Sequence, residues 1–267
     1  MRAAAVQLNS GADVDRNLEA ADRLTRAAAR DGARLVVLPE KWPALGDPDV
    51  VASGAERADD ILAWASQIAN ELDIDLVAGS IAIASSDGRL RNTAVHVGPD
   101  GETKARYTKM HLFDVEVEGR TYRESDREDA GADPALATIG DDARLGLAIC
   151  YDLRFPALFE ALDAEIFALP SAFTLATTRD HWDVLVRARA IEQQAFFVAA
   201  NQTGEHPGGM RSGGRSMIVD PWGVVLAQAP DSETYVTADL NLAGLHRIRE
   251  QLPALRHRRA VEHETHA

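Results

Sequence analysis

The chain has 267 residues, of which 46% are hydrophobic and 26% charged, a composition typical of a folded globular protein rather than a disordered one. Its formal net charge of −14 argues against binding to nucleic acid or to an anionic membrane surface, because both repel an acidic protein. The charge does not exclude an anionic small substrate, since a few Arg or Lys side chains can dominate inside a cleft.

Two kinds of apolar periodicity alternate along the chain. Short runs rich in Val, Ile, Leu and Ala predict strands, and apolar residues every three or four positions predict helices. The predicted strands are 2–8, 34–38, 75–83, 91–97, 102–107, 144–149, 166–169, 196–200, 216–219, 224–228 and 234–239. The predicted helices are 14–31, 57–72, 178–194 and 241–250, the last with Asn241 as its N-cap.

Turn signals organise these elements. The tetrapeptide 98–101 (GPDG) and the tripeptide 221–223 (PWG) each separate two predicted strands and indicate hairpins. The early alternation of strands and helices, followed by hairpins, predicts an α/β protein with mixed strand directions. We interpret 116–133 as a long surface loop and 254–267 as a C-terminal tail, within a single domain that spans 1–267.

The only cysteine, Cys150, ends a predicted strand, and a polar segment with a helical pattern follows it. A nucleophile at such a strand-to-helix turn is exposed, and backbone N–H groups near it can bind an oxyanion. The alternative is a buried, inert thiol, since free cysteine is among the most buried residue types. A single cysteine forms no intrachain disulfide, which fits a reducing compartment. No run approaches the roughly 20 apolar residues of a membrane helix. We therefore expect a cytoplasmic protein.

Three charged residues are further candidates. Glu40 follows the predicted strand 34–38, at the edge of the sheet where α/β sites gather; a solvated strand end is the alternative. Lys109 lies among apolar and aromatic neighbours in a chain with only three lysines, and a surface position is its alternative. Glu124 cannot be distinguished by pattern from the acidic residues around it. The histidine spacing does not match that of a zinc site, so we expect neither a metal nor a cofactor.

Three segments together resemble motifs of the nitrilase, or carbon–nitrogen hydrolase, superfamily. They are 38–40 (LPE), 107–114 (YTKMHLFD) and 149–156 (ICYDLRFP), in the order and with the long gaps of that family. The segments 170–173, 181–194, 216–223 and 252–259 resemble its amidase branch, near the groups that act on deaminated glutathione and on omega-amides. Thr108 and Arg215 depart from the residues usual at their positions in the family.

The resemblance implies a four-layer α-β-β-α sandwich that packs against a second copy as a homodimer or higher homo-oligomer. It implies that Glu40, Lys109 and Cys150 form a catalytic triad and that Glu124 is a second carboxylate that orients the lysine. It also implies a binding pocket formed by Tyr151, Arg154, Ser171, Ala172 and Phe173. For a substrate carboxylate, Arg154 or Arg215 is the expected cationic partner.

The implied reaction is hydrolysis of a small linear amide, such as deaminated glutathione or an alpha-keto acid amide, through a thioester on Cys150. Glu40 is the implied base, and Lys109 with the backbone N–H of Tyr151 binds the oxyanion. An N-carbamoyl amidohydrolase or an aliphatic amidase would use the same residues. A non-catalytic binding or scaffold protein on the same fold is the alternative of another class.

Overall fold

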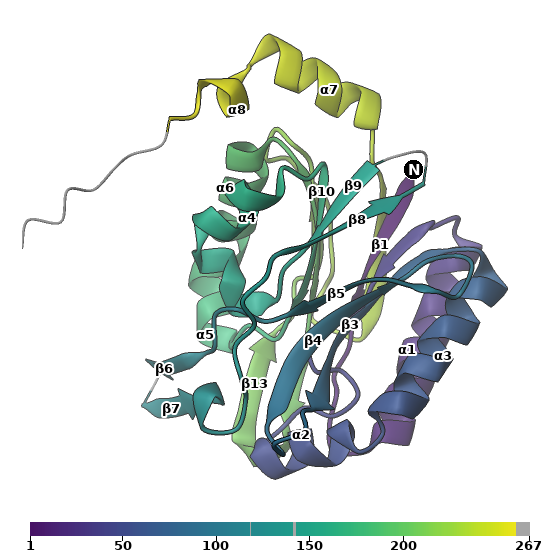
Figure 1. Ribbon diagram of the computed structural model, residues 1–267, viewed down its shortest axis with the longest axis vertical. Helices are drawn as coiled ribbons and strands as arrows, with labels where there is room; N and C mark the ends of the chain where they lie inside the picture. The colour runs from purple at the N-terminus through teal and green to yellow at the C-terminus, as the bar shows by residue number, and fades with distance from the viewer. Residues whose placement is uncertain (118, 141–142, 260–267) are drawn as a thin grey trace, which may run out of the picture.

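The computed structural model describes residues 1–117, 119–140 and 143–259, which fold around two six-stranded sheets (Figure 1). The first sheet has the strand order β16-β1-β2-β3-β4-β5. Its strands are β1 (Arg2–Gln7), β2 (Leu35–Val37), β3 (Asp75–Ala84), β4 (Leu90–Val97), β5 (Thr103–Thr108) and β16 (Thr234–Asp239). Strands β1, β2 and β3 are parallel, whereas β4, β5 and β16 pair antiparallel with their neighbours.

The second sheet has the order β15-β14-β11-β10-β9-β8. Its strands are β8 (Ala135–Ile139), β9 (Ala143–Leu147), β10 (Ile166–Ser171), β11 (Phe196–Asn201), β14 (Met217–Val219) and β15 (Val225–Gln228). Here β9, β10 and β11 are parallel, and antiparallel strands flank them on both sides. Both sheets therefore combine a parallel centre with antiparallel edges, as the mixed pattern predicted.

Helices cover the outer face of each sheet (Figure 1). Helices α1 (Val14–Arg30) and α3 (Ala58–Leu72) lie on the first sheet, and α4 (Pro156–Leu162) and α6 (Asp183–Gln193) lie on the second. Side chains alternate along β1: Ala4 and Val6 join the core beneath α1 and α3, whereas Ala3 and Ala5 join the core shared with the second sheet. This arrangement confirms the four-layer α-β-β-α sandwich.

The remaining elements lie at the edges of the sandwich. They are α2 (Pro48–Ala55), the hairpin β6 (Asp114–Val117) and β7 (Arg120–Arg123), the 3-10 turn η1 (Glu124–Asp126), the 3-10 turn η2 (Cys150–Arg154), α5 (Leu175–Thr177), the π-helical turn η3 (Thr178–Trp182), the hairpin β12 (Thr203–His206) and β13 (Met210–Gly213) with the turn η4 (Pro207–Gly209), α7 (Leu242–Gln251) and α8 (Ala254–His257). Asn241 caps α7 by accepting from the Gly244 N–H at 2.9 Å, as predicted.

The structure corrects one prediction and describes the start of the C-terminal tail. The segment 116–133 is not an irregular loop, because it contains most of the β6–β7 hairpin and η1, and Glu128 within it is buried. The tail 254–267 begins with the short helix α8, and Arg258 donates to the Glu192 carbonyl at 3.3 Å; residues 260–267 lie outside the described part of the chain. Across the described ranges, no helix is long and apolar enough to cross a membrane.

Candidate active site

The residues expected to form a triad come from different parts of the fold and meet in one cavity. Glu40 follows β2, Lys109 follows β5, and Cys150 follows β9 of the opposite sheet. All three line a cavity of about 180 Å³, and Glu124 lines it as well. The cavity therefore lies at one end of the sandwich, where segments from both sheets converge.

Cys150 occupies a strained turn. Its φ of 47° lies in the left-handed region, and it is the first residue of η2. Asp152 holds this turn, because its carboxylate accepts from the Ile149 N–H at 2.8 Å and the Tyr107 hydroxyl at 2.8 Å, and pairs with His111 Nδ1 at 2.7 Å. The same carboxylate therefore links the turn of Cys150 to the segment that carries Lys109.

The turn of Glu40 is held against β3. The Pro39 carbonyl accepts from the Ser80 N–H at 3.2 Å, and the Trp42 indole donates to the Ala78 carbonyl at 2.8 Å. Gly79, at a φ of 62°, makes this close approach possible, since a Cβ there would lie 2.2 Å from the Pro39 oxygen. A larger residue at 79 would push Glu40 away from its place.

The Glu40 carboxylate is buried and hydrogen-bonded. Its Oε1 accepts from Lys109 Nζ at 2.9 Å and from Asn92 Nδ2 at 2.8 Å. The Cys150 thiol lines the same cavity, and burial and this carboxylate both raise the pKa of the thiol. Glu40 is thus oriented by two donors and interacts with the thiol.

Lys109 bridges two carboxylates. Its Nζ lies 2.9 Å from Glu40 Oε1 and 2.8 Å from Glu124 Oε2, and the lysine is 1% exposed. Glu124 Oε2 also accepts from the Phe113 N–H at 2.8 Å. Although burial alone would raise the pKa of Glu124, Lys109 and Lys41 hold that pKa well below its usual range. Glu124 is therefore ionised at neutral pH.

Burial raises the pKa of the Cys150 thiol well above its usual range, and the charge of Glu40 raises it further. Lys109 and the backbone N–H of Ala172, which donates to the sulfur, act in the opposite direction. The resting cysteine is thus a neutral thiol at pH 7. It needs a base to become nucleophilic, and Glu40 is in contact with it.

The structure tests the positions of the residues expected to bind substrate. Tyr151, Arg154, Ala172 and Phe173 line the cavity. Ser171 is not among the described residues that line it: its side chain is fully buried, and its carbonyl accepts from the Glu40 N–H at 3.3 Å. The expected place of Ser171 in the lining of the pocket is therefore corrected, and its carbonyl instead bonds the backbone of Glu40.

Of the two arginines expected to bind a substrate carboxylate, one is among the described residues that line the cavity and the other is not. The Arg154 guanidinium lies over the rings of Tyr151 and Phe173, and its Nη2 is 3.2 Å from His181 Nδ1. Arg215 is absent from the described lining of the cavity, and its carbonyl accepts from the Trp182 indole at 2.8 Å. Of the two arginines expected to meet a substrate carboxylate, only Arg154 lines the cavity among the described residues.

The sequence interpretation missed several residues of this site. Lys41 donates to Glu124 Oε1 at 2.9 Å and to Glu128 Oε1 at 2.5 Å, and both Lys41 and Glu128 line the cavity. Asn92 was missed because a buried amide inside a strand leaves no pattern. Lys41 had a usable signal, since it is one of three lysines, directly follows Glu40 and precedes a tryptophan.

The cavity is cationic although the protein is acidic. Seven Lys or Arg residues line it, against four Asp or Glu residues. Five of the seven are arginines, namely Arg120, Arg123, Arg127, Arg154 and Arg211. In a chain of net charge −14, this local surplus favours an anionic ligand. Among the described residues, no group of three or more His, Cys, Asp or Glu is arranged to hold a metal ion.

Residues 2–250 match the sequence profile of the family described as Carbon-nitrogen hydrolase. This chain belongs to the carbon–nitrogen hydrolase family. It is 39% identical to a deaminated glutathione amidase of Synechocystis sp., over 96% of this chain and 97% of that protein. It is 34% identical to an omega-amidase of Pongo abelii, over 97% of this chain and 95% of that protein.

The structure is also similar to that of the C. elegans NitFhit protein, with a TM-score of 0.89 and 35% identity over 97% of this chain. This chain spans 65% of that longer protein. Together, the family match and these relatives identify the chain as an enzyme, a hydrolase that acts on carbon–nitrogen bonds other than peptide bonds. The binding-protein alternative is therefore set aside.

Proposed function

We propose that this hydrolase cleaves a small anionic amide, of the deaminated-glutathione or alpha-keto acid amide class, through a thioester on Cys150. One observation carries the proposal: the Cys150 thiol, the Glu40 carboxylate and the Lys109 ammonium meet in a cavity with a cationic lining. The substrates named for the relatives, deaminated glutathione and omega-amides, agree with this charge.

In the first half of the reaction, Glu40 accepts the thiol proton while Cys150 Sγ attacks the amide carbonyl. Lys109 has three N–H groups, of which two donate to Glu40 and Glu124, so the third binds the oxyanion together with the Tyr151 N–H. One such donor contributes roughly 3–4 kcal/mol to the transition state. Glu40 then passes its proton to the amide nitrogen, the C–N bond breaks, and the amine or ammonia leaves.

In the second half, water replaces the amine. The oxygen of the water attacks the thioester carbonyl while Glu40 accepts a proton from the water. Lys109 and the Tyr151 N–H again bind the oxyanion. The C–S bond breaks, the thiolate regains its proton from Glu40, and the carboxylic acid leaves. Splitting the hydrolysis in this way replaces one high barrier with two lower ones.

A substrate panel tests the proposal. Deaminated glutathione, alpha-ketoglutaramate, an N-carbamoyl amino acid and uncharged butyramide are compared by kcat/KM. We expect release of 2-oxoglutarate from the first two, and the larger kcat/KM of these two identifies the branch. Carbon dioxide released with ammonia would instead indicate the N-carbamoyl amidohydrolase, and preference for butyramide would indicate an aliphatic amidase and contradict the anionic substrate.

Replacement of Arg154 by methionine tests the recognition of the substrate carboxylate within that panel. A charge-assisted hydrogen bond contributes about 1.5–3 kcal/mol, so we expect KM for alpha-ketoglutaramate to rise about tenfold or more. The same variant should change KM for butyramide little. Arg23→Met, an exposed arginine of α1, is the matched control and should leave both values unchanged.

We also propose that the chain forms a homodimer through the outer face of α6. Val184 and Ile191 on this helix are 67% and 50% exposed, and Trp222 and Val224 in the adjoining turn are 60% and 49% exposed. The two segments are joined by the bond from Arg187 Nε to the Gly223 carbonyl, at 2.7 Å. Contiguous exposed apolar side chains of this kind mark contact surfaces.

Light scattering after size exclusion measures the oligomeric state. We expect twice the chain mass for the wild type and the mass of one chain for Trp222→Glu. Leu136→Glu, an equally apolar and 44% exposed position on β8, is the control and should remain dimeric. A monomeric wild type would contradict the proposal.

The cytoplasm is the compartment that we propose. Support comes from Cys150, a free thiol on which the mechanism depends. Reducing compartments keep such thiols free.

A further inference from the structure

A second buried lysine extends the cluster beyond the four residues used above. Lys41 directly follows Glu40, has a φ of 47°, and is 6% exposed. Its Nζ lies 2.9 Å from Glu124 Oε1, whereas Lys109 binds the other oxygen, Oε2. Glu124 is thus held from both sides by two lysines, although only Lys109 takes part in the mechanism.

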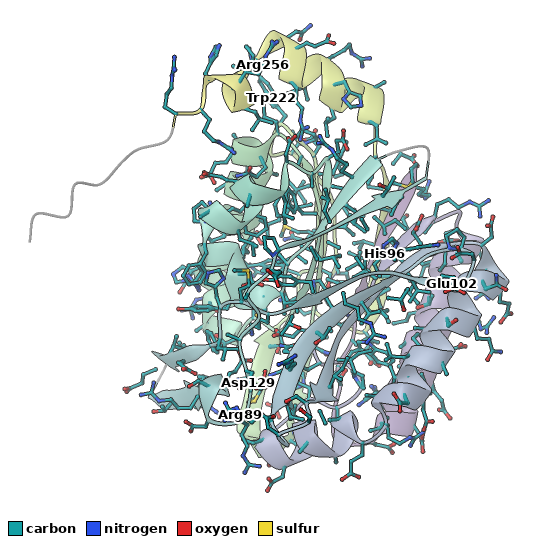
Figure 2. The ribbon with its side chains drawn as sticks, viewed as in Figure 1. Arg89, His96, Glu102, Asp129, Trp222 and Arg256 are labelled. Carbon is teal, nitrogen blue, oxygen red and sulfur yellow. The ribbon has the colours of Figure 1, made fainter. Side chains whose placement is uncertain are left out.

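Glu128 completes the arrangement. Its Oε1 lies 2.5 Å from Lys41 Nζ, and its Oε2 is buried without a hydrogen-bond partner among the described residues. Arg89 positions this segment, because its Nη2 donates to the Ser125 and Glu128 carbonyls at 2.7 and 2.8 Å and its Nε to Asp129. Figure 2 shows Arg89 and Asp129 at the same edge of the molecule.

These contacts form a chain of alternating charges. It runs from Glu128 through Lys41, Glu124 and Lys109 to Glu40, which contacts the Cys150 thiol. Burying five ionisable groups is expensive, and a buried ion pair is often no more stable than an apolar pair of the same volume. The pair formed by Lys41 and Glu128 is therefore not explained by stability alone.

We propose that Lys41, anchored by Glu128, is a positioning residue that limits the hold of Glu124 on Lys109. While Lys41 occupies Glu124 Oε1, Glu124 accepts only one hydrogen from Lys109, through Oε2. Without Lys41, Glu124 Oε1 is free to turn toward Lys109 and compete for the N–H that binds the oxyanion. Lys41 thus acts on the transition state through Glu124, without touching the reacting atoms.

The test removes the pair as a unit. Lys41→Met/Glu128→Leu replaces the buried pair with apolar side chains, so that no unpaired charge remains and the fold is preserved. We expect kcat to fall about 10- to 100-fold with KM little changed, a smaller loss than the 10²–10³ typical of losing an oxyanion donor outright. Glu128→Gln keeps an acceptor for Lys41 and therefore keeps Lys41 on Glu124, so its fall in kcat should be smaller than that of the double variant.

A second readout needs no substrate. Lys109 stabilises the Cys150 thiolate less when both oxygens of Glu124 bind it. Iodoacetamide alkylation of Cys150 should therefore reach its half-maximal rate about one pH unit higher in the double variant. The ionisable groups that bear on this profile are Glu40, Lys41, Lys109, Glu124, Glu128 and Cys150. Lys104→Met, a surface lysine paired with Asp100, is the control and should change neither readout.

The outcomes separate this inference from the proposed function on which it rests. Wild-type kcat and an unmoved alkylation profile in the double variant would overturn the role of Lys41, as would an equal defect in Glu128→Gln. If the wild type hydrolyses no amide of the panel, the proposed function fails, and the alkylation profile alone decides the role of Lys41. Should the apolar pair not fold, Lys41→Met/Glu128→Gln also removes both charges and leaves Glu124 Oε1 without its donor, so it carries the same expectations.

Discussion

Replacement of Cys150 by alanine is expected to abolish amide hydrolysis, with kcat lower by about four to six orders of magnitude, as for other covalent nucleophiles. No other nucleophile contacts Glu40 among the described residues, because the remaining groups around its carboxylate are the donors Lys109 and Asn92. Steady-state release of 2-oxoglutarate measures the loss. Intact-mass measurement after acid quench should show an acyl adduct on the wild type and none on the variant.

The control for this prediction is stability. Cys150 is strained at a φ of 47°, but alanine also carries a Cβ and meets the same strain, so the change removes only the sulfur. We therefore expect a melting temperature within a few degrees of the wild type, since a loss of about 1 kcal/mol corresponds to roughly 2–4 °C in a chain of this size. Activity that persists in a well-folded Cys150→Ala variant would sink the thioester mechanism.

The sequence predicted the strands of both sheets except the edge strand β8, because the centres of the sheets are continuous apolar runs. The parallel strands β10 and β11 are buried on both faces, and their periodicity with the intervening helix is unambiguous. The β6–β7 hairpin was missed because its strands have four residues each and are only half buried, so that charged residues dominate the pattern. A hairpin of this kind forms through tertiary contacts rather than through local propensity.

The residues of the site likewise fall into those that a local pattern predicts and those that depend on tertiary contacts. Glu40, Lys109 and Cys150 each follow a strand inside a recognisable motif, and they meet because the two sheets of the sandwich bring these strand ends together. Ser171 was expected in the pocket from the resemblance of its segment to the amidase branch, but its side chain is fully buried at the end of β10. Lys41 and Glu128 lie 87 positions apart, and their contact depends on how Arg89 folds the segment after η1 onto the cavity. No local pattern encodes such a contact.

Replacement of Glu40 by glutamine is expected to separate the two properties of Cys150, its reactivity and its catalytic use. General base catalysis contributes about 10²–10⁴-fold, so kcat for amide hydrolysis should fall by that factor. Glutamine keeps the shape of the side chain but accepts no proton from the thiol or from water. Alkylation by iodoacetamide should nevertheless persist, since that electrophile needs only the thiolate.

The direction of the pH effect follows from the charges around the sulfur. The negative charge of Glu40 raises the pKa of Cys150, whereas the Lys109 ammonium lowers it. Removing the charge of Glu40 therefore lowers the thiol pKa, increases the thiolate fraction at a given pH, and displaces the alkylation profile of Glu40→Gln toward lower pH. A profile displaced to higher pH, or amide hydrolysis that survives at the wild-type rate, would show that another group takes the proton. Asn92 and Lys109 still bind the side chain at position 40 in this variant, so the segment that carries it should stay in place. If hydrolysis is lost while alkylation persists, the cause is therefore the missing base.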